Sequence, residues 1–331
     1  MLHYCCTMSI LLDISTDEAS WMDGLRKWAG ENIDVLLVLV AVSLLCIIAL
    51  IIAIYRIIII KRKSVSKLAE KNMEIREVNN KMLGSVNYAS RIQGAVITSI
   101  VDVNAIFPVN FILYRPRDIV GGDYYRALRC GRYSVMITAD CTGHGIPGAL
   151  LSMLGISALR EYMVTEQDAE NPGTVLDRMR SFIKSTLVKS GGGSLDDGMD
   201  MTICSFDFEK MEIRYAIANQ TALIIRGNDV IRLKGDAMPV GSYVREKEHF
   251  KTQVVGIEKG DMVYMFSDGL QDQLGGRDCR KYLLKNLTAT LIEIHNDPMN
   301  EQRVALEQTI IAWRGGNPQI DDMTMVGIRV G

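Results

Sequence analysis

The cysteines of this sequence are few and are not spaced as metal ligands or disulfide partners usually are. The 331 residues include 7 cysteines, with no Cys-x-x-Cys pair among them. Neither a structural zinc site nor a disulfide framework is therefore predicted. Scattered cysteines of this kind are typical of a reducing compartment.

Proline, aromatic residues and net charge are also scarce. The chain has 7 prolines, 7% aromatic residues and 23% charged residues, whereas 48% of it is hydrophobic. This composition excludes a mainly disordered chain. The 37 lysines and arginines nearly balance the 39 acidic residues, which leaves a net charge of −2. Because phosphate contacts need clustered basic side chains, no nucleic-acid partner is predicted.

One long apolar run lies near the N-terminus. No charged residue occurs from Val35 to Tyr55, and about 20 apolar residues are enough to span a bilayer. We therefore assign residues 35–60 to a transmembrane helix. A cleaved signal peptide is disfavoured because the run starts late and lacks a basic region before it.

Basic residues are distributed unevenly around this run. The first 34 residues contain only Arg26 and Lys27, whereas five basic residues follow the run: Arg56, Lys61, Arg62, Lys63 and Lys67. The positive-inside rule then predicts that everything after residue 60 is cytoplasmic. Residues 1–34 form a short extracytoplasmic segment, which is too short to be a folded sensor domain.

Residues 61–97 are predicted to form a helical neck. They are polar, free of proline and carry a heptad pattern, although Lys71 and Ser85 interrupt it. The apolar positions are Leu68, Ile75, Met82, Ala89 and Val96, with Val78 and Ile92 between them. This pattern favours a parallel two-helix neck and a homodimer. The alternative is a single amphipathic helix that lies on the following domain.

Residues 98–331 are predicted to form one α+β domain. Apolar runs indicate strands at 133–139, 201–206, 213–217, 222–226, 262–266 and 323–330. Short turns near Glu209–Lys210 and Gly227–Asn228 favour hairpins. Helices are predicted at 146–163, 174–187, 281–294 and 300–313. Strands in hairpins, with helices set apart, favour α+β over a doubly wound sheet.

Acidic residues occur at four strand edges that the motifs predict in this domain. They lie in the phrases IVGGDYY, ITADCTGHG, YMFSDG and QIDDMTMVGI, and they are Asp123, Asp140, Asp268, Asp321 and Asp322. If the edges converge, mutual repulsion raises the pKa values of the carboxyl groups. Mg²⁺ or Mn²⁺ would remove that repulsion, since hard oxygen ligands suit these ions. The histidines His3, His249 and His295 lie far from these phrases, so no zinc cluster competes.

The same motifs carry a family resemblance. The series RPRDIVGGDYY, ADCTGHGIPGALLSMLG, DGMDMTICSFD, FSDGLQDQLGG and QIDDMTMVGIRV is similar to the SpoIIE-type branch of the PPM-class serine/threonine phosphatases. The YASRIQ phrase at residues 88–93 resembles the neck of the membrane-anchored bacterial set. The resemblance implies a PPM-type α-β-β-α sandwich, in which two stacked sheets are flanked by helices. It also implies a site for two metal ions at one edge.

The resemblance also implies a role for each site residue. Asp140 corresponds to the acid that bridges both ions, and Asp322 lies beyond the ligands. The remaining implied ligands are Asp123, Asp268, Asp321 and the backbone carbonyl of Cys141, with Asp197 at a weaker third ion. His144 either protonates the leaving group or bonds the backbone to hold its loop.

The activity implied by the resemblance is metal-dependent hydrolysis of phosphoserine or phosphothreonine by an activated water. Mn²⁺ or Mg²⁺ would be the cofactor, and the substrate would be a phosphorylated regulatory protein of the anti-sigma antagonist type. The expected location is the inner (cytoplasmic) membrane, with a single pass and the catalytic domain in the cytoplasm. Two alternatives remain open: an inactive partner-binding module of the same fold, and a GGDEF-like nucleotide cyclase. The cyclase leaves the SDG and DD motifs unexplained.

Overall fold

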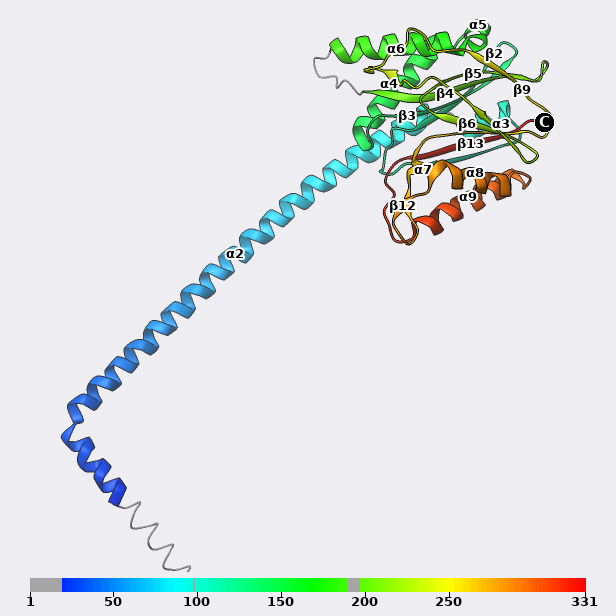
Figure 1. Ribbon diagram of the computed structural model, residues 1–331. Coiled ribbons are helices and arrows are strands. Elements are labelled where there is room, and N and C mark those ends of the chain that lie inside the picture. The colour runs from blue at the N-terminus through cyan, green and yellow to red at the C-terminus, as the bar shows by residue number, and fades with distance from the viewer. Residues whose placement is uncertain (1–19, 98, 190–196) are drawn as a thin grey trace, which may run out of the picture. The chain divides into compact units, whose positions relative to one another are not determined.

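The computed structural model describes residues 20–97, 99–189 and 197–331, and it divides into two units at Asn80 and Lys81. The first unit is helical over residues 20–31 and along most of α2 (Ile33–Val96), the long blue-to-cyan helix in Figure 1. This helix is long and apolar enough to cross a membrane, and its apolar window is not buried by the described residues. Cys5, Cys6, His3 and the first 19 residues of the predicted outer segment lie outside the described residues.

The predicted neck is helical from residue 61 to Val96, in agreement with its lack of proline. The heptad positions Leu68, Ile75 and Met82 are all more than half exposed. Only the last turns of α2 become buried in the second unit, where Gln93 is 5% exposed and Val96 packs against the core. Pairing of two necks stays a prediction.

The second unit contains two antiparallel sheets, which confirms the predicted α+β sandwich. The first sheet has the order β1-β13-β10-β6-β7, with β1 (Asn110–Arg115), β13 (Met323–Arg329), β10 (Met262–Phe266), β6 (Thr221–Arg226) and β7 (Asp229–Leu233). The second has the order β2-β3-β4-β5-β9, and β8 also pairs with β4. Its strands are β2 (Tyr124–Cys130), β3 (Tyr133–Cys141), β4 (Gly198–Asp207), β5 (Glu212–Ala218), β8 (Val240–Gly241) and β9 (Gln253–Gly256).

Helices cover the outer face of each sheet. The second sheet carries α4 (Gly145–Tyr162), α5 (Glu166–Glu170) and α6 (Pro172–Lys189), whereas α8 (Leu283–Ile294) and α9 (Met299–Arg314) cover the first (Figure 1). The short elements are α3 (Ile100–Ile106), α7 (Gly269–Asp272), β11 (Leu274–Gly275) and β12 (Arg280–Lys281). The result is an α-β-β-α sandwich with three apolar layers.

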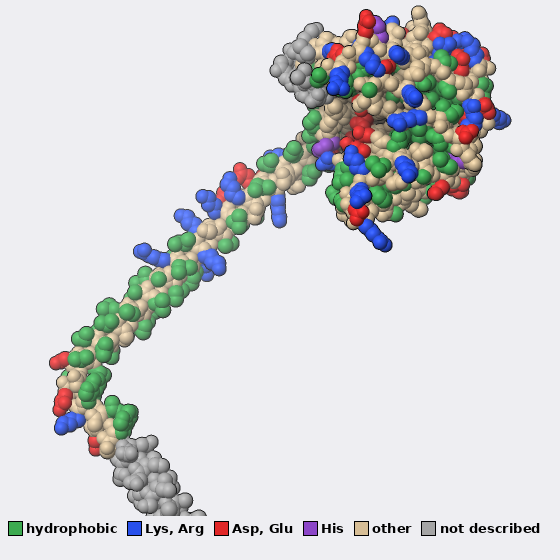
Figure 2. Space-filling model, viewed as in Figure 1, with side chains coloured by type: hydrophobic (Ala, Val, Ile, Leu, Met, Phe, Trp, Pro, Cys, Tyr) green, Lys and Arg blue, Asp and Glu red, His purple; other side chains and the backbone are tan. Residues whose placement is uncertain are grey.

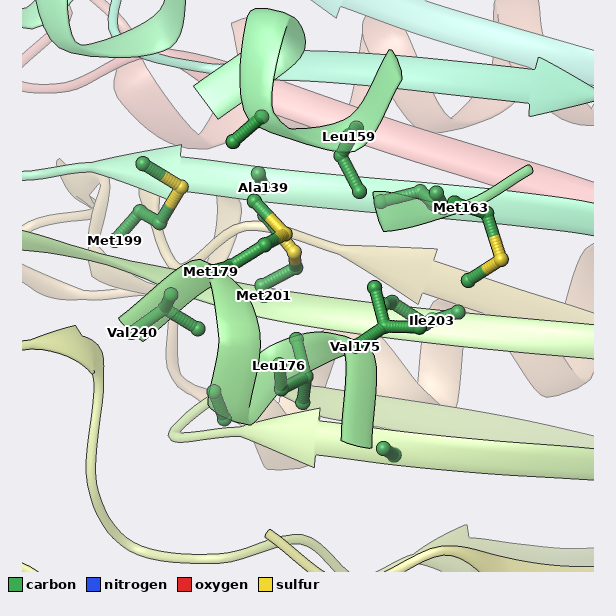
Figure 3. Packing of buried hydrophobic residues seen from close by; sticks show 14 of the residues in the cluster. Ala139, Leu159, Met163, Val175, Leu176, Met179, Met199, Met201, Ile203 and Val240 are labelled. Atoms are coloured by element: carbon green, nitrogen blue, oxygen red, sulfur yellow. The ribbon is translucent and has the colours of Figure 1, made fainter. Parts of the chain in front are cut away.

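The alternation of side chains along each strand builds these layers. In β3, Val135 and Ile137 point to the layer under α4 and α6, whereas Met136 points between the sheets. Every residue of β10 is buried because both of its faces are covered. Figure 3 shows the layer beneath α4 and α6, in which methionines such as Met179 and Met201 fill the space between helix and sheet.

Candidate active site

Five chain segments bring acidic residues to one end of the sandwich. Asp140 lies near the end of β3, directly opposite Asp200 of β4 in the sheet register. Asp123 immediately precedes β2, Asp268 follows β10, and Asp321 precedes β13. Because neighbouring strands are antiparallel, the end of one strand and the start of the next share an edge. The expectation that these edges converge is therefore confirmed.

Four of these acids, Asp140, Asp200, Asp268 and Asp321, line one pocket of about 390 Å³, whereas Asp123 is not among its lining residues. Its walls come from β3 and the loop after it, β4, the turn before β6, the residues on both sides of β8, and the segments after β10 and before β13. They are formed by Asp140, Cys141, Thr142, Gly143, His144, Asp200, Asn219, Pro239, Ser242, Tyr243, Asp268 and Asp321. On the face shown in Figure 2, acidic side chains gather in a hollow of this domain.

Burial and mutual repulsion disfavour the ionised form of these acids. Burial, followed by the charges of Asp123 and Asp268, raises the pKa of Asp140 well above its usual range. Burial likewise raises the pKa of Asp123 to about 7 and that of Asp200 to about 6. The pKa values of Asp268 and Asp321 are raised as well, again mainly by burial. The site therefore gathers carboxyl groups whose ionised forms are disfavoured in the metal-free protein.

Asp123 is the most deeply buried of the predicted ligands, at 1% exposure. The hydroxyl of Ser267 donates to its Oδ2 at 2.6 Å, and the same hydroxyl accepts from the backbone N–H of Thr324 at 3.0 Å. Ser267 thus ties the start of β2 to β10 and β13, two inner strands of the other sheet. This tie fixes the orientation of the Asp123 carboxyl group.

Asp322 accepts hydrogen bonds from the backbone of the loop that carries Asp123. Its Oδ1 accepts from the backbone N–H of Arg117 at 2.6 Å, and its Oδ2 accepts from those of Gly122 at 2.6 Å and Asp123 at 3.4 Å. Asp321 instead faces the pocket. The two neighbouring acids therefore have different tasks, in line with the prediction that Asp322 lies beyond the metal ligands.

Gly122 lets the Asp123 loop approach the loop after β3. A Cβ atom on Gly122 would lie 2.8 Å from the carbonyl oxygen of Gly143 and 2.9 Å from that of Cys141. A real side chain cannot occupy that space without moving the backbone, so glycine is required here. The carbonyl of Cys141, which the resemblance implies as a ligand, is thereby held beside the Asp123 loop.

His144 lies at the mouth of the pocket. It precedes the first turn of α4, its side chain is 48% exposed, and its Nδ1 lies 3.0 Å from Oδ2 of Asp118. This placement is compatible with either predicted role, and both stay predictions. Arg115 and Arg117 of the RPRDIVGGDYY phrase contact residues that do not line the pocket: Arg115 pairs with Glu307 at 3.3 Å, and Arg117 donates to the carbonyl of Ile320 at 3.0 Å.

Asp197 and Asp200, both in the DGMD phrase, are placed differently. Asp197 precedes β4 and is not among the residues that line the pocket, so its role at a third ion stays a prediction. Asp200 does line the pocket, and the side-chain amide of Asn219 donates to its Oδ2 at 2.8 Å. Sequence reasoning missed Asp200. Asp200 directly precedes the predicted strand at 201–206, and its pairing with Asp140 in the sheet sets the two acids side by side.

Gln93 connects the end of α2 to the site. Its side-chain amide nitrogen donates to the carbonyl of Gly121 at 2.7 Å and to Ser152 Oγ at 2.9 Å, and its Oε1 accepts from the N–H of Gly121 at 3.4 Å. Gly121 lies two residues before Asp123. The YASRIQ phrase therefore ends in a residue that holds the loop of Asp123, a predicted metal ligand.

The chemistry of these donors fits divalent cations. Within the described residues, no three His, Cys, Asp or Glu side chains form a closed metal-ligand group. Mg²⁺ is usually held by one or two carboxylates and retains several waters, so a closed group is not required. The residues that would hold two ions are Asp123, Asp140, Asp268, Asp321 and the carbonyl of Cys141. A cation there would relieve the repulsion that raises their pKa values.

Comparison with known proteins identifies the family. The family model described as Stage II sporulation protein E (SpoIIE) matches residues 130–331, which is more than half of the chain. The chain belongs to the SpoIIE family. It is thus a serine/threonine phosphatase of the PPM class, whose members are metal-dependent. The comparison with curated proteins found no match.

Solved structures agree with this assignment of the SpoIIE domain. The SiaA-PP2C domain of Pseudomonas aeruginosa is 28% identical, with a TM-score of 0.68 over 76% of this chain and 98% of that one. The Bacillus subtilis SpoIIE phosphatase domain with a regulatory-domain fragment is 18% identical, with a TM-score of 0.55 over 66% and 62% of the chains. The RsbU and RsbW domains of a Mycobacterium tuberculosis protein are 22% identical, with a TM-score of 0.52 over 66% and 59%. The last two share the fold.

Proposed function

We propose that this SpoIIE-family protein removes phosphate from phosphoserine or phosphothreonine on a regulatory protein of the anti-sigma antagonist type. The observation that carries the proposal is the convergence of Asp123, Asp140, Asp268 and Asp321 at one end of the sandwich, with raised pKa values. In the similar Mycobacterium tuberculosis structure, an RsbU domain accompanies an RsbW domain, and homologues of this kind act in partner-switching modules.

Bound Mn²⁺ or Mg²⁺ would supply a water of lowered pKa and charge to stabilise the phosphoryl oxygens. The protein's own residues provide the frame for this chemistry. Ser267 and Asp322 orient Asp123 and its loop, and Gly122 allows the loop to pack against the Cys141 carbonyl. His144 at the pocket mouth is the candidate to hold the proton that the leaving oxygen takes up.

The proposal includes a membrane anchor and a dimeric neck. The apolar helix with basic residues on one flank supports a single pass through the cytoplasmic membrane, with the catalytic domain inside. The exposed heptad positions Leu68, Ile75 and Met82 support pairing with a second copy, since apolar side chains at that spacing form a two-helix seam.

Phosphatase assays of the full-length protein in detergent test the activity. We expect turnover of para-nitrophenyl phosphate and of a phosphoserine peptide with Mn²⁺, and none in EDTA. Asp140→Asn should lower the rate by about a hundredfold or more, since a site carboxylate loses its charge. Asp229→Asn, an exposed acid of β7, is the matched control and should retain the wild-type rate. Turnover that persists in chelator would contradict metal dependence.

The two alternatives predict different results in the same assays. An inactive partner-binding module would hydrolyse neither substrate under any metal condition. A nucleotide cyclase would consume nucleoside triphosphate and leave the phosphopeptide intact. The family assignment and the presence of all four acids favour the phosphatase.

A further inference from the structure

A groove of about 420 Å³ lies beside the catalytic pocket. One wall is the turn between β5 and β6, and the other is the end of β7 with the segment that follows it. The lining residues are Asn219, Gln220, Thr221 and residues 232–237. Asn219 also lines the catalytic pocket. The two hollows therefore share a wall, and a chain that leaves the pocket across Asn219 enters the groove.

The groove presents positive charge, in contrast to the acidic pocket. Arg232 and Lys234 are exposed, and neither forms an ion pair with any residue in the described part of the chain. Arg232 donates to Thr221 Oγ1 at 3.2 Å, which directs its guanidinium group along the groove wall. These two cations can therefore receive an acidic ligand without breaking an internal ion pair.

The acid in the groove does not cancel this charge. Asp236 is 4% exposed, and its carboxylate accepts from Lys247 Nζ and from the backbone N–H of Lys251, both at 2.9 Å. Its charge is thus balanced within the wall. The surface that a ligand meets is set by Arg232 and Lys234.

Backbone contacts brace both walls against each other. The N–H of Asn219 donates to the carbonyl of Asp236 at 2.8 Å, and the N–H of Asp236 donates to the carbonyl of Ile217 at 2.8 Å. A Cβ on Gly235 would collide with the Ile217 carbonyl, so glycine permits this close packing. The groove is a fixed feature of the fold at the mouth of the site.

We propose that this groove binds an acidic stretch of the phosphoprotein substrate next to the phosphorylated residue. The inference rests on the proposed phosphatase function and deepens it by naming a substrate feature. An acidic pocket alone would repel acidic sequences. Arg232 and Lys234 of the adjoining groove, which form no ion pair within the described residues, would attract such sequences and fix the direction in which the chain leaves. Specificity then comes from the residues that flank the phosphoserine.

Synthetic phosphoserine peptides test the proposal with the full-length protein and Mn²⁺. One peptide has uncharged flanks, two have four aspartates or glutamates before or after the phosphoserine, and two have lysines at the same places. We expect one acidic peptide to show a kcat/KM about tenfold above the uncharged one, and we expect added salt to reduce this advantage. The Arg232→Glu/Lys234→Glu double variant should lose the advantage and gain activity on the matching lysine peptide.

A second double variant controls for the change in charge. Lys210→Glu/Lys259→Glu alters two exposed lysines at the other end of the strands and should keep the acidic preference. Both double variants should hydrolyse para-nitrophenyl phosphate at the wild-type rate, since this small substrate does not reach the groove. Equal kcat/KM for all flanks, or an acidic preference that survives the Arg232/Lys234 reversal, would overturn the groove proposal alone. Absence of turnover on every substrate would overturn the proposed function itself.

Discussion

The buried carboxyl group of Asp123 is expected to destabilise the metal-free protein at neutral pH. Its pKa is about 7 in the folded protein and near 3.8 in the unfolded chain, because burial disfavours the charged form and Asp322 and Asp321 add repulsion. Between these two pH values the folded chain binds more protons than the unfolded chain. The free energy of unfolding therefore falls as pH rises from about 4 to about 7.

The size of the effect follows from the difference between the two pKa values. One pKa unit corresponds to about 1.4 kcal/mol, so the full difference amounts to about 4 kcal/mol at pH 8. Asp123→Asn is neutral at every pH and keeps an oxygen that can accept from Ser267, which donates to Asp123 at 2.6 Å. We expect metal-free Asp123→Asn to be about 2–4 kcal/mol more stable than wild type at pH 8 and nearly equal to it near pH 4.

Urea unfolding in EDTA, followed by circular dichroism between pH 4 and pH 8, measures this difference. Asp229→Asn is the control, and its difference from wild type should not change with pH. Added Mn²⁺ should reverse the order, because the ion stabilises the wild-type site by binding the folded state. A variant that is less stable than wild type across the whole pH range in EDTA would refute the reasoning.

Three further predictions concern the residues around the site and the neck. Asp322→Asn should destabilise the domain by about 1–3 kcal/mol in urea unfolding, since an amide N–H₂ would face the N–H groups of the Asp123 loop. Unchanged stability would show that these hydrogen bonds do not stabilise the domain. Gln93→Leu should leave the buried N–H and carbonyl of Gly121 without partners and raise the Mn²⁺ concentration needed for half-maximal activity several-fold. The control Asn80→Leu, on the exposed part of α2, should leave that concentration unchanged, and an equal response of the two variants would contradict the link through Gln93. Inserting one residue after Lys71 turns the following part of the helix by about 100°, whereas inserting seven residues restores nearly the same phase. Phosphatase activity should change strongly in the one-residue variant and little in the seven-residue variant. Equal rates for the two variants would show that the neck does not control activity.

Much of the fold could be predicted because its signals are local. The hairpin of β6 and β7 follows from the Gly227–Asn228 turn, and the strand β10 follows from a short, wholly apolar run. The strands β1 and β2 were not predicted. In β2, Arg126 and Arg129 interrupt the apolar pattern, and pairing with β3 rather than intrinsic preference determines the strand.

The site was predictable only in part. Acids next to strand ends were visible in the sequence, but which acids face the pocket depends on strand register, as Asp200 shows. The separate tasks of Asp321 and Asp322 depend on which carboxyl group meets the backbone of a loop about 200 residues earlier. Such contacts join segments that are far apart in the sequence, so no local sequence pattern predicts them.

The loop that carries Asp123 is held from opposite ends of the chain. Asp322, just before the last strand, binds the N–H of Gly122, and Gln93, in the last turns of α2, binds both the N–H and the carbonyl of Gly121. Asp322 belongs to the sandwich, whereas Gln93 belongs to the helix that continues into the predicted neck. Any movement of α2 that withdraws Gln93 would leave the buried N–H and carbonyl groups of Gly121 without these partners. Each unpaired group costs about 1–3 kcal/mol of free energy. Loss of these hydrogen bonds would therefore weaken the hold on the loop that carries Asp123. The helix that leads away from the site is therefore physically connected to the geometry of a predicted metal ligand.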